Sequence, residues 1–102
     1  MAVLPLEMPT DDLTEFRRRH GVRRLSVFGS ALREDFRDES DLDILIEFEE
    51  GRVPGFFRLM AMQAELSALV GRTVDLRTPA DLSRYFRDQV LAEAEVVSSD
   101  TE

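Results

Sequence analysis

Two aspartates in one short segment have the residue type and spacing to bind a divalent metal ion. Asp41 and Asp43 stand at the start of the apolar run Ile44-Leu45-Ile46. In an extended strand alternate side chains share a face and each residue advances about 3.3 Å, so the Cα atoms of the two aspartates lie roughly 6.6 Å apart. Mg²⁺ prefers oxygen ligands and accepts phosphate oxygens beside one or two carboxylates. The segment therefore predicts a site for metal and phosphate.

A Gly-Ser pair upstream has the residue types of a phosphate-binding turn. Gly29-Ser30 follows the strand-like run 24–28 and is separated from the first of these aspartates by ten residues. Glycine lets a phosphate approach the backbone closely, and backbone N–H groups at such a turn point at an anion. Ser30 adds a hydroxyl, and Arg33 is placed to reach a phosphate or to pair with Asp35.

A third aspartate stands inside another short strand. Asp75 lies among apolar neighbours in the run 73–76, directly after a glycine helix stop. If this strand lies next to the strand of Asp43, Asp75 completes a three-carboxylate cluster and can bind metal or act as the general base for an attacking hydroxyl. Ser40-Asp41 alone also fits an ordinary turn, because Ser and Asp bond to nearby backbone. The prediction therefore rests on the turn, the spacing and the three aspartates together.

Taken together, these motifs resemble those of the minimal nucleotidyltransferases, small members of the polymerase-beta-like superfamily. The resemblance is carried by Gly29-Ser30, ten residues, Asp41-x-Asp43 and the later Asp75, and it runs from about residue 25 to about residue 95. Many members of that family are antitoxins that transfer AMP from ATP to a tyrosine of a HEPN-domain ribonuclease toxin. The resemblance implies the same function here, with Mg²⁺ as cofactor, a cognate HEPN-type toxin as partner and a hetero-oligomer with that toxin.

The resemblance also implies the roles of individual residues. The catalytic and metal-binding residues that it implies are Asp41, Asp43 and Asp75. The nucleotide-binding residues that we expect are Gly29, Ser30, Arg33 and Ser40. The family often has glycine after the arginine matched by Arg33, where this chain has Glu34. This departure changes the expected shape of the loop and removes no acidic position.

Two other functions fit the same residues. The first is an antitoxin that masks its toxin by binding alone, with the acidic cluster as a relic. The second is a nucleotidyltransferase that acts on a small molecule such as an aminoglycoside. Larger enzymes of that kind carry a second domain for recognising their substrate, and 102 residues leave room for only one modest core. We therefore expect the substrate to be recognised through the surface of a partner protein.

Charge and composition narrow the choice of partners. The chain has 13 basic and 21 acidic residues and a net charge of −8, which repels a nucleic-acid backbone. With no cysteine, disulfides are excluded. Residues 1–6 lack the basic and apolar regions of a secretory signal, and no apolar run is long enough to span a membrane. We expect a cytoplasmic protein that contacts neither nucleic acid nor membrane.

The order of predicted elements indicates the α/β (α+β) class, with a small mixed β-sheet and flanking helices. A single domain is expected over residues 1–97, followed by a disordered tail at 98–102. Helices are predicted over about 10–20, 55–70 and 80–93, and strands over 24–28, 43–48 and 73–76, with a short edge strand at 96–97. A polar loop is expected over 34–40. This arrangement places the acidic residues at one end of the sheet.

Two aromatic pairs stand in the predicted helices. The helix 55–70 begins with Phe56-Phe57 and is apolar on more than one face. Either a partner protein or the last helix is expected to cover the side chains that the sheet leaves exposed. Tyr85-Phe86 belongs to the last predicted helix, and we expect both side chains to pack against the domain.

Overall fold

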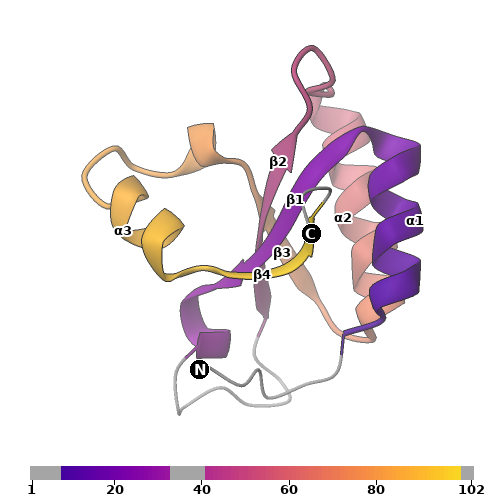
Figure 1. The fold of residues 1–102 in the computed structure, drawn as a ribbon, viewed down its shortest axis with the longest axis horizontal. Coiled ribbons are helices and arrows are strands. Elements are labelled where there is room, and N and C mark those ends of the chain that lie inside the picture. Colours follow the sequence, from indigo (N-terminus) through magenta and orange to yellow (C-terminus); the bar gives the residue numbers. More distant parts are fainter. Residues whose placement is uncertain (1–7, 33–40, 100–102) are drawn as a thin grey trace.

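The computed structural model describes residues 8–32 and 41–99, which form a four-stranded sheet with helices on both faces (Figure 1). The elements follow the chain as α1 (Thr10–His20), β1 (Val22–Phe28), the 3₁₀ turn η1 (Gly29–Leu32), β2 (Leu42–Phe48), α2 (Phe56–Val70), β3 (Val74–Arg77), the 3₁₀ turn η2 (Pro79–Asp81), α3 (Arg87–Glu93) and β4 (Glu95–Ser99). The strands are ordered β3-β2-β1-β4. β2 and β3 run parallel while the other pairs are antiparallel, so the predicted mixed sheet is confirmed.

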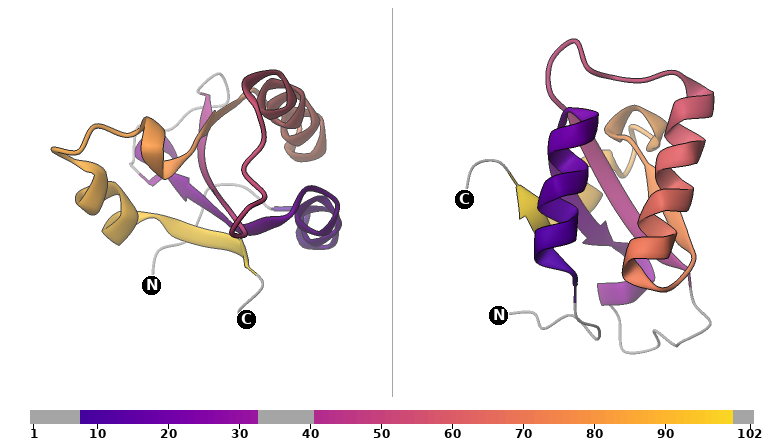
Figure 2. Two further views of the ribbon diagram at one scale, coloured as in Figure 1. Left: turned by 90° about the horizontal axis from the view of Figure 1, so that it is seen from above. Right: turned by 90° about the vertical axis from the view of Figure 1, so that its right-hand side faces the viewer.

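Different elements cover the two faces of the sheet. α1 and α2 lie side by side on one face, and η2 and α3 lie over the opposite face (Figure 2). Side chains alternate along each strand, so Leu25, Ile44 and Ile46 join the core under α1 and α2 and are 0% exposed. We call this side of the sheet the helix face. The opposite side carries Phe28 and Asp43, and we call it the carboxylate face.

Helix α1 ends where the sequence predicts, at the glycine that follows it. Gly21 follows it with a φ of 66°, and its N–H donates to the carbonyl oxygen of Arg17. A left-handed φ costs glycine little, so this residue ends the helix and turns the chain into β1. Leu13 and Phe16 then pack into the core cluster on the helix face. None of the helices in residues 8–32 and 41–99 is long and apolar enough to cross a membrane.

The edge strand β3 is held in place by side chains of α2. The Val74 N–H donates to Ser67 Oγ at 3.0 Å, and the Leu76 N–H donates to Gln63 Oε1 at 2.9 Å. These are the amides that point away from β2, and a sheet edge otherwise leaves such groups open. Asp75 lies between the two bonded residues, so α2 fixes the backbone on either side of this carboxylate.

The last predicted helix is broken in the structure, which corrects the expected helix over residues 80–93. A 3₁₀ turn at η2 is closed by Asp81, whose Oδ2 accepts from the N–H and the hydroxyl of Thr78, each at 3.1 Å. Leu82 then adopts extended backbone angles and is only 8% exposed. The helix resumes only at Arg87. Burial of Leu82 offsets the loss of helical hydrogen bonds at this position.

The C-terminal strand is longer than predicted, which corrects the expected start of the tail at residue 98. Ser98 and Ser99 belong to β4 and are buried. Arg17 of α1 donates from Nε to Ser98 Oγ at 2.6 Å, and this contact ties β4 to the helix face. Residues 100–102 lie outside the described residues.

The aromatic pair at the start of α2 stays exposed. Phe56 is 68% exposed and Phe57 is 87% exposed, with their ring centroids 5.7 Å apart. α3 lies over the carboxylate face, so the alternative in which the last helix covers these side chains is wrong. The expected packing of Tyr85-Phe86 is also wrong, because these side chains are 85% and 50% exposed.

Candidate active site

The strand register brings two of the predicted aspartates together. β2 and β3 pair in parallel with Asp43 opposite Asp75, so both side chains lie on the carboxylate face. Neighbouring strands are about 4.8 Å apart, which places both carboxylates within reach of one bound ion. Both also line a single hollow of about 310 Å³. The prediction for Asp75 required its strand to lie next to the strand of Asp43, and the two strands are indeed neighbours.

Gly29 lies directly against the Asp43 carboxylate. Phe28 pairs with Asp43 across β1 and β2, and the chain turns at the next residue, where Gly29 has a φ of 69°. A β-carbon on Gly29 would overlap Asp43 Oδ2 and lie 3.3 Å from Asp43 Cγ. Only glycine lets the Asp43 carboxylate come this close, so the Gly-Ser turn and Asp43 are in direct contact.

Arg77 supplies a positive charge beside Asp75. Its Nε lies 3.3 Å from Asp75 Oδ1, and its Nη2 donates to Asp75 Oδ2 at 3.4 Å. Both side chains keep more than a third of their surface exposed. The guanidinium thus orients one carboxylate while leaving it accessible from the hollow. Because Arg77 stands two residues after Asp75, strand alternation puts both on one face, and that spacing could have identified Arg77 from sequence.

The remaining wall of this hollow was missed by the sequence analysis. It is formed by Phe28, Asp81, Leu82, Ser83 and Phe86. Alternation along β1 places the Phe28 side chain on the carboxylate face, just as alternation along β2 places Asp43 there. The sequence pattern could therefore have identified Phe28. The others stand on the segment between β3 and α3, where a continuous helix was expected and no sequence signal marked the break.

The structure describes the other predicted site residues only in part. Asp41 is exposed and stands directly before β2. The N–H of Leu42, the first residue of β2, donates to the Thr73 carbonyl oxygen at 2.9 Å. Ser30 belongs to η1 by its backbone. The Ser30 side chain, Arg33, Glu34 and Ser40 lie outside what the structure describes. In residues 8–32 and 41–99, no group of three or more acidic, His or Cys side chains converges as a metal-binding cluster.

The residues that do converge fit a divalent cation. Asp43 and Asp75 place two carboxylates opposite each other on adjacent strands, where a single divalent cation can bind both. The missing β-carbon at Gly29 lets the Asp43 carboxylate lie directly against the backbone of the turn. Oxygen-only ligands with room for phosphate oxygens are the donor set that Mg²⁺ prefers.

The chain belongs to the nucleotidyltransferase domain family, which it matches over residues 13–97. It is 39% identical over 97 residues to the protein adenylyltransferase MntA of Thermococcus cleftensis, and the match covers 91% of this chain and 96% of that protein.

Solved structures show the same fold. A candidate minimal nucleotidyltransferase is 38% identical, with a TM-score of 0.67 over 82% of this chain and 84% of the other. A toxin-antitoxin complex crystallised with AMP-PNP matches with a TM-score of 0.71 at 16% identity, over 92% of this chain and 76% of that one. At that identity the second match shows the fold alone. Together they confirm the predicted α+β nucleotidyltransferase fold.

Proposed function

We propose that this chain is a cytoplasmic antitoxin that transfers AMP from ATP to a tyrosine hydroxyl of a cognate HEPN-type toxin and thereby neutralises it. The observation that carries the proposal is the register pair Asp43–Asp75, with Gly29 in direct contact with the Asp43 carboxylate. A relative of nearly equal length is named a protein adenylyltransferase, and a fold neighbour is a toxin-antitoxin complex with an ATP analogue.

The proposed ligands of the cation are Asp41, Asp43 and Asp75. When bound, Mg²⁺ neutralises charge that builds up on the triphosphate during transfer. The backbone of the Gly29-Ser30 turn donates N–H groups to the phosphates, and glycine permits their close approach. Arg33 and Ser40 complete the proposed nucleotide-binding set.

Asp75 is the proposed base for the acceptor. Its carboxylate takes the proton of the tyrosine hydroxyl as the hydroxyl oxygen forms a bond to the α-phosphorus. The bond from that phosphorus to the bridging oxygen breaks, and pyrophosphate leaves. Arg77, 3.3 Å from Asp75, holds this carboxylate in position. The chain thus contributes orientation and charge, which account for most of the catalysis in such transfers.

Intact-mass spectrometry of the partner tests the proposal. The product of the neighbouring gene is incubated with this protein, ATP and Mg²⁺, and the double variant Asp41→Asn/Asp43→Asn is the control. A gain of one or more AMP masses that the double variant cannot produce is the expected result. An unmodified partner in a stable complex would contradict transfer and support masking by binding. Modification of small acceptors such as aminoglycosides, with none of the partner, would support the small-molecule alternative.

A further inference from the structure

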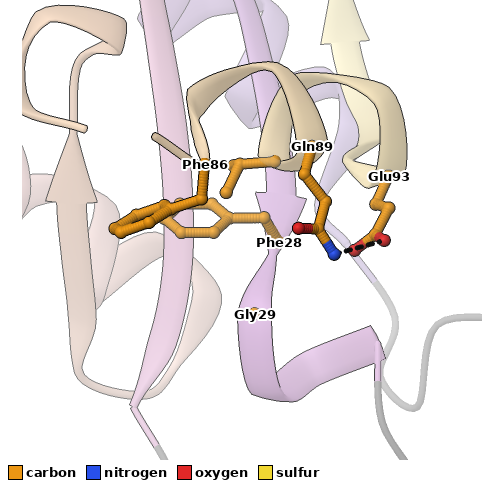
Figure 3. A pocket seen from close by; sticks show the side chains of 6 residues that line it. Phe28, Gly29, Phe86, Gln89 and Glu93 are labelled. Atoms are coloured by element: carbon orange, nitrogen blue, oxygen red, sulfur yellow. Dashed lines mark hydrogen bonds between the residues drawn. The ribbon is translucent and has the colours of Figure 1, made fainter. Parts of the chain in front are cut away.

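A second hollow lies beside the carboxylate hollow and shares two of its aromatic residues. Its volume is about 290 Å³, and it is lined by Phe28, Gly29, Phe86, Gln89, Val90 and Glu93 (Figure 3). Phe28 and Phe86 also line the hollow of Asp43 and Asp75. Whole ligands typically occupy roughly 300 to 1,000 Å³. The two hollows lie at or just below the lower end of this range, so each has room for one part of a nucleotide, and their shared wall suits a ligand that occupies both.

The charge of the two hollows differs. Among the described residues, the lining of the second hollow includes no arginine and carries the carboxylate of Glu93, whereas Arg77 stands in the hollow of Asp43 and Asp75. A phosphate is disfavoured beside Glu93, since like charges repel, and is favoured where a cation and Arg77 are at hand. The part of a nucleotide that fits the second hollow is the uncharged base.

Phe86 supplies a flat apolar surface that the protein itself leaves half uncovered. Its side chain is 50% exposed, while Phe28 on the other element is partly buried at the end of β1. Bases stack on aromatic side chains through their flat faces, and such stacking is a principal source of affinity where proteins bind single bases. Val90 extends this apolar lining.

Gln89 and Glu93 supply hydrogen-bond acceptors at the edge of the same hollow. Both side chains point from α3 toward the chain turn at Gly29 (Figure 3), and the Gln89 Nε2 donates to Glu93 Oε1 at 3.2 Å. This bond orients the amide and leaves the Gln89 Oε1 and the second Glu93 oxygen to accept hydrogen bonds. The exocyclic amino group of adenine is a donor that matches them.

We propose that this hollow, lined by Phe28, Phe86, Gln89 and Glu93, binds the adenine base of the nucleotide substrate. The proposal rests on the proposed use of ATP and adds the residues that select the base. Phe86 stacks on the base, and Gln89 with Glu93 accepts from its amino group. Gly29 lines this hollow and also touches the Asp43 carboxylate, so the phosphates lie where the turn meets Asp43 and the base lies on the α3 side of the turn.

Isothermal titration calorimetry with Mg²⁺ and two ligands tests the stacking role. ATP and inorganic tripolyphosphate are titrated into the wild-type protein, Phe86→Ala and Phe57→Ala. Phe57→Ala removes an even more exposed phenyl ring from the start of α2, outside both hollows, and is the matched control. Phe86→Ala is expected to weaken ATP binding roughly tenfold and to leave tripolyphosphate binding unchanged. Phe57→Ala is expected to change neither.

The outcomes separate this proposal from the proposed function. Unchanged ATP affinity in Phe86→Ala, or an equal loss for both ligands, would overturn the base site while leaving the phosphate site intact. A wild-type protein that binds neither ligand would overturn both proposals. Inosine triphosphate, with a carbonyl in place of the amino group, is expected to bind the wild type roughly tenfold more weakly than ATP. Equal affinities would overturn the assignment of Gln89 and Glu93.

Discussion

On the helix face of β2, Ile44 and Ile46 are completely buried under α1 and α2, whereas Asp43 on the carboxylate face of the same strand lines an open hollow. The same contrast recurs on β3, where Leu76 is buried and Asp75 is accessible. Strand alternation thus assigns neighbouring residues to different tasks. The helix face carries the main core cluster, and the carboxylate face presents the proposed ligands. Substitutions one residue apart should therefore separate stability from activity.

The largest expected effect is on the carboxylate face. Asp43→Asn keeps the size of the side chain and removes the negative charge opposite Asp75. Substitution of residues that only support a metal ligand typically costs roughly 10- to 100-fold in activity. Because Asp43 is a proposed direct ligand, we expect transfer activity to fall by more than this. The melting temperature should stay close to that of the wild type. AMP transfer and thermal unfolding, measured on one preparation, check both, and full activity would remove Asp43 from the proposed metal site.

The neighbouring substitution on the helix face should have the opposite profile. Ile44→Ala leaves a cavity in the core, and truncations of this kind cost about 2–5 kcal/mol of unfolding free energy. Activity per folded molecule should be kept at low temperature, because Ile44 faces away from the hollow. Denaturant unfolding and a transfer assay measure the two effects. Loss of activity without loss of stability would contradict the separation of the two faces.

Gly29 is expected to affect both stability and activity, because it turns the chain after β1 with a left-handed φ and its missing side chain makes room for the Asp43 carboxylate. Gly29→Ala strains a left-handed φ, at a cost of about 1–2 kcal/mol, and also pushes a methyl group into the Asp43 carboxylate. Both stability and transfer should fall. Gly51→Ala is the matched control, since Gly51 has a φ of 78° and no neighbouring atom within 4 Å of an added β-carbon. It should lose similar stability and keep its activity.

How much of this could be predicted from the sequence depends on the range of the interactions. Alternation along 43–48 and the glycine after α1 are local, and they predicted the strand and the end of the helix. The break after η2 depends on the burial of Leu82 at the carboxylate face, which residues 80–93 do not reveal by themselves. For the same reason the exposed ring of Phe86 was expected to be packed. The contact between Gly29 and Asp43 joins two separate segments of the chain, so it could not be predicted without the register of the sheet.

The smallest expected effect concerns an ion pair that joins the two helices of the helix face. Glu65 on α2 accepts hydrogen bonds from Arg19 and, at 3.0 Å, from His20 on α1. The Arg19 guanidinium, with a smaller contribution from His20, lowers the pKa of Glu65 below its ordinary value of 4.5, although burial opposes the shift. The folded state therefore binds the Glu65 proton less readily than the unfolded state. This stabilisation is present above pH 4.5 and is lost as the pH falls through the lower folded-state pKa.

Glu65→Gln isolates this contribution. At neutral pH the variant should lose no more than about 1 kcal/mol of unfolding free energy, because the pair is partly exposed. The difference from the wild type should shrink as the pH falls below 4.5, where the wild-type carboxylate also becomes neutral. Transfer activity at neutral pH should not change, since Glu65 lies on the helix face. Denaturant unfolding of both proteins across this pH range makes the measurement. A constant difference would mean that the Gln side chain acts through packing and that charge at this pair contributes little to holding α1 against α2.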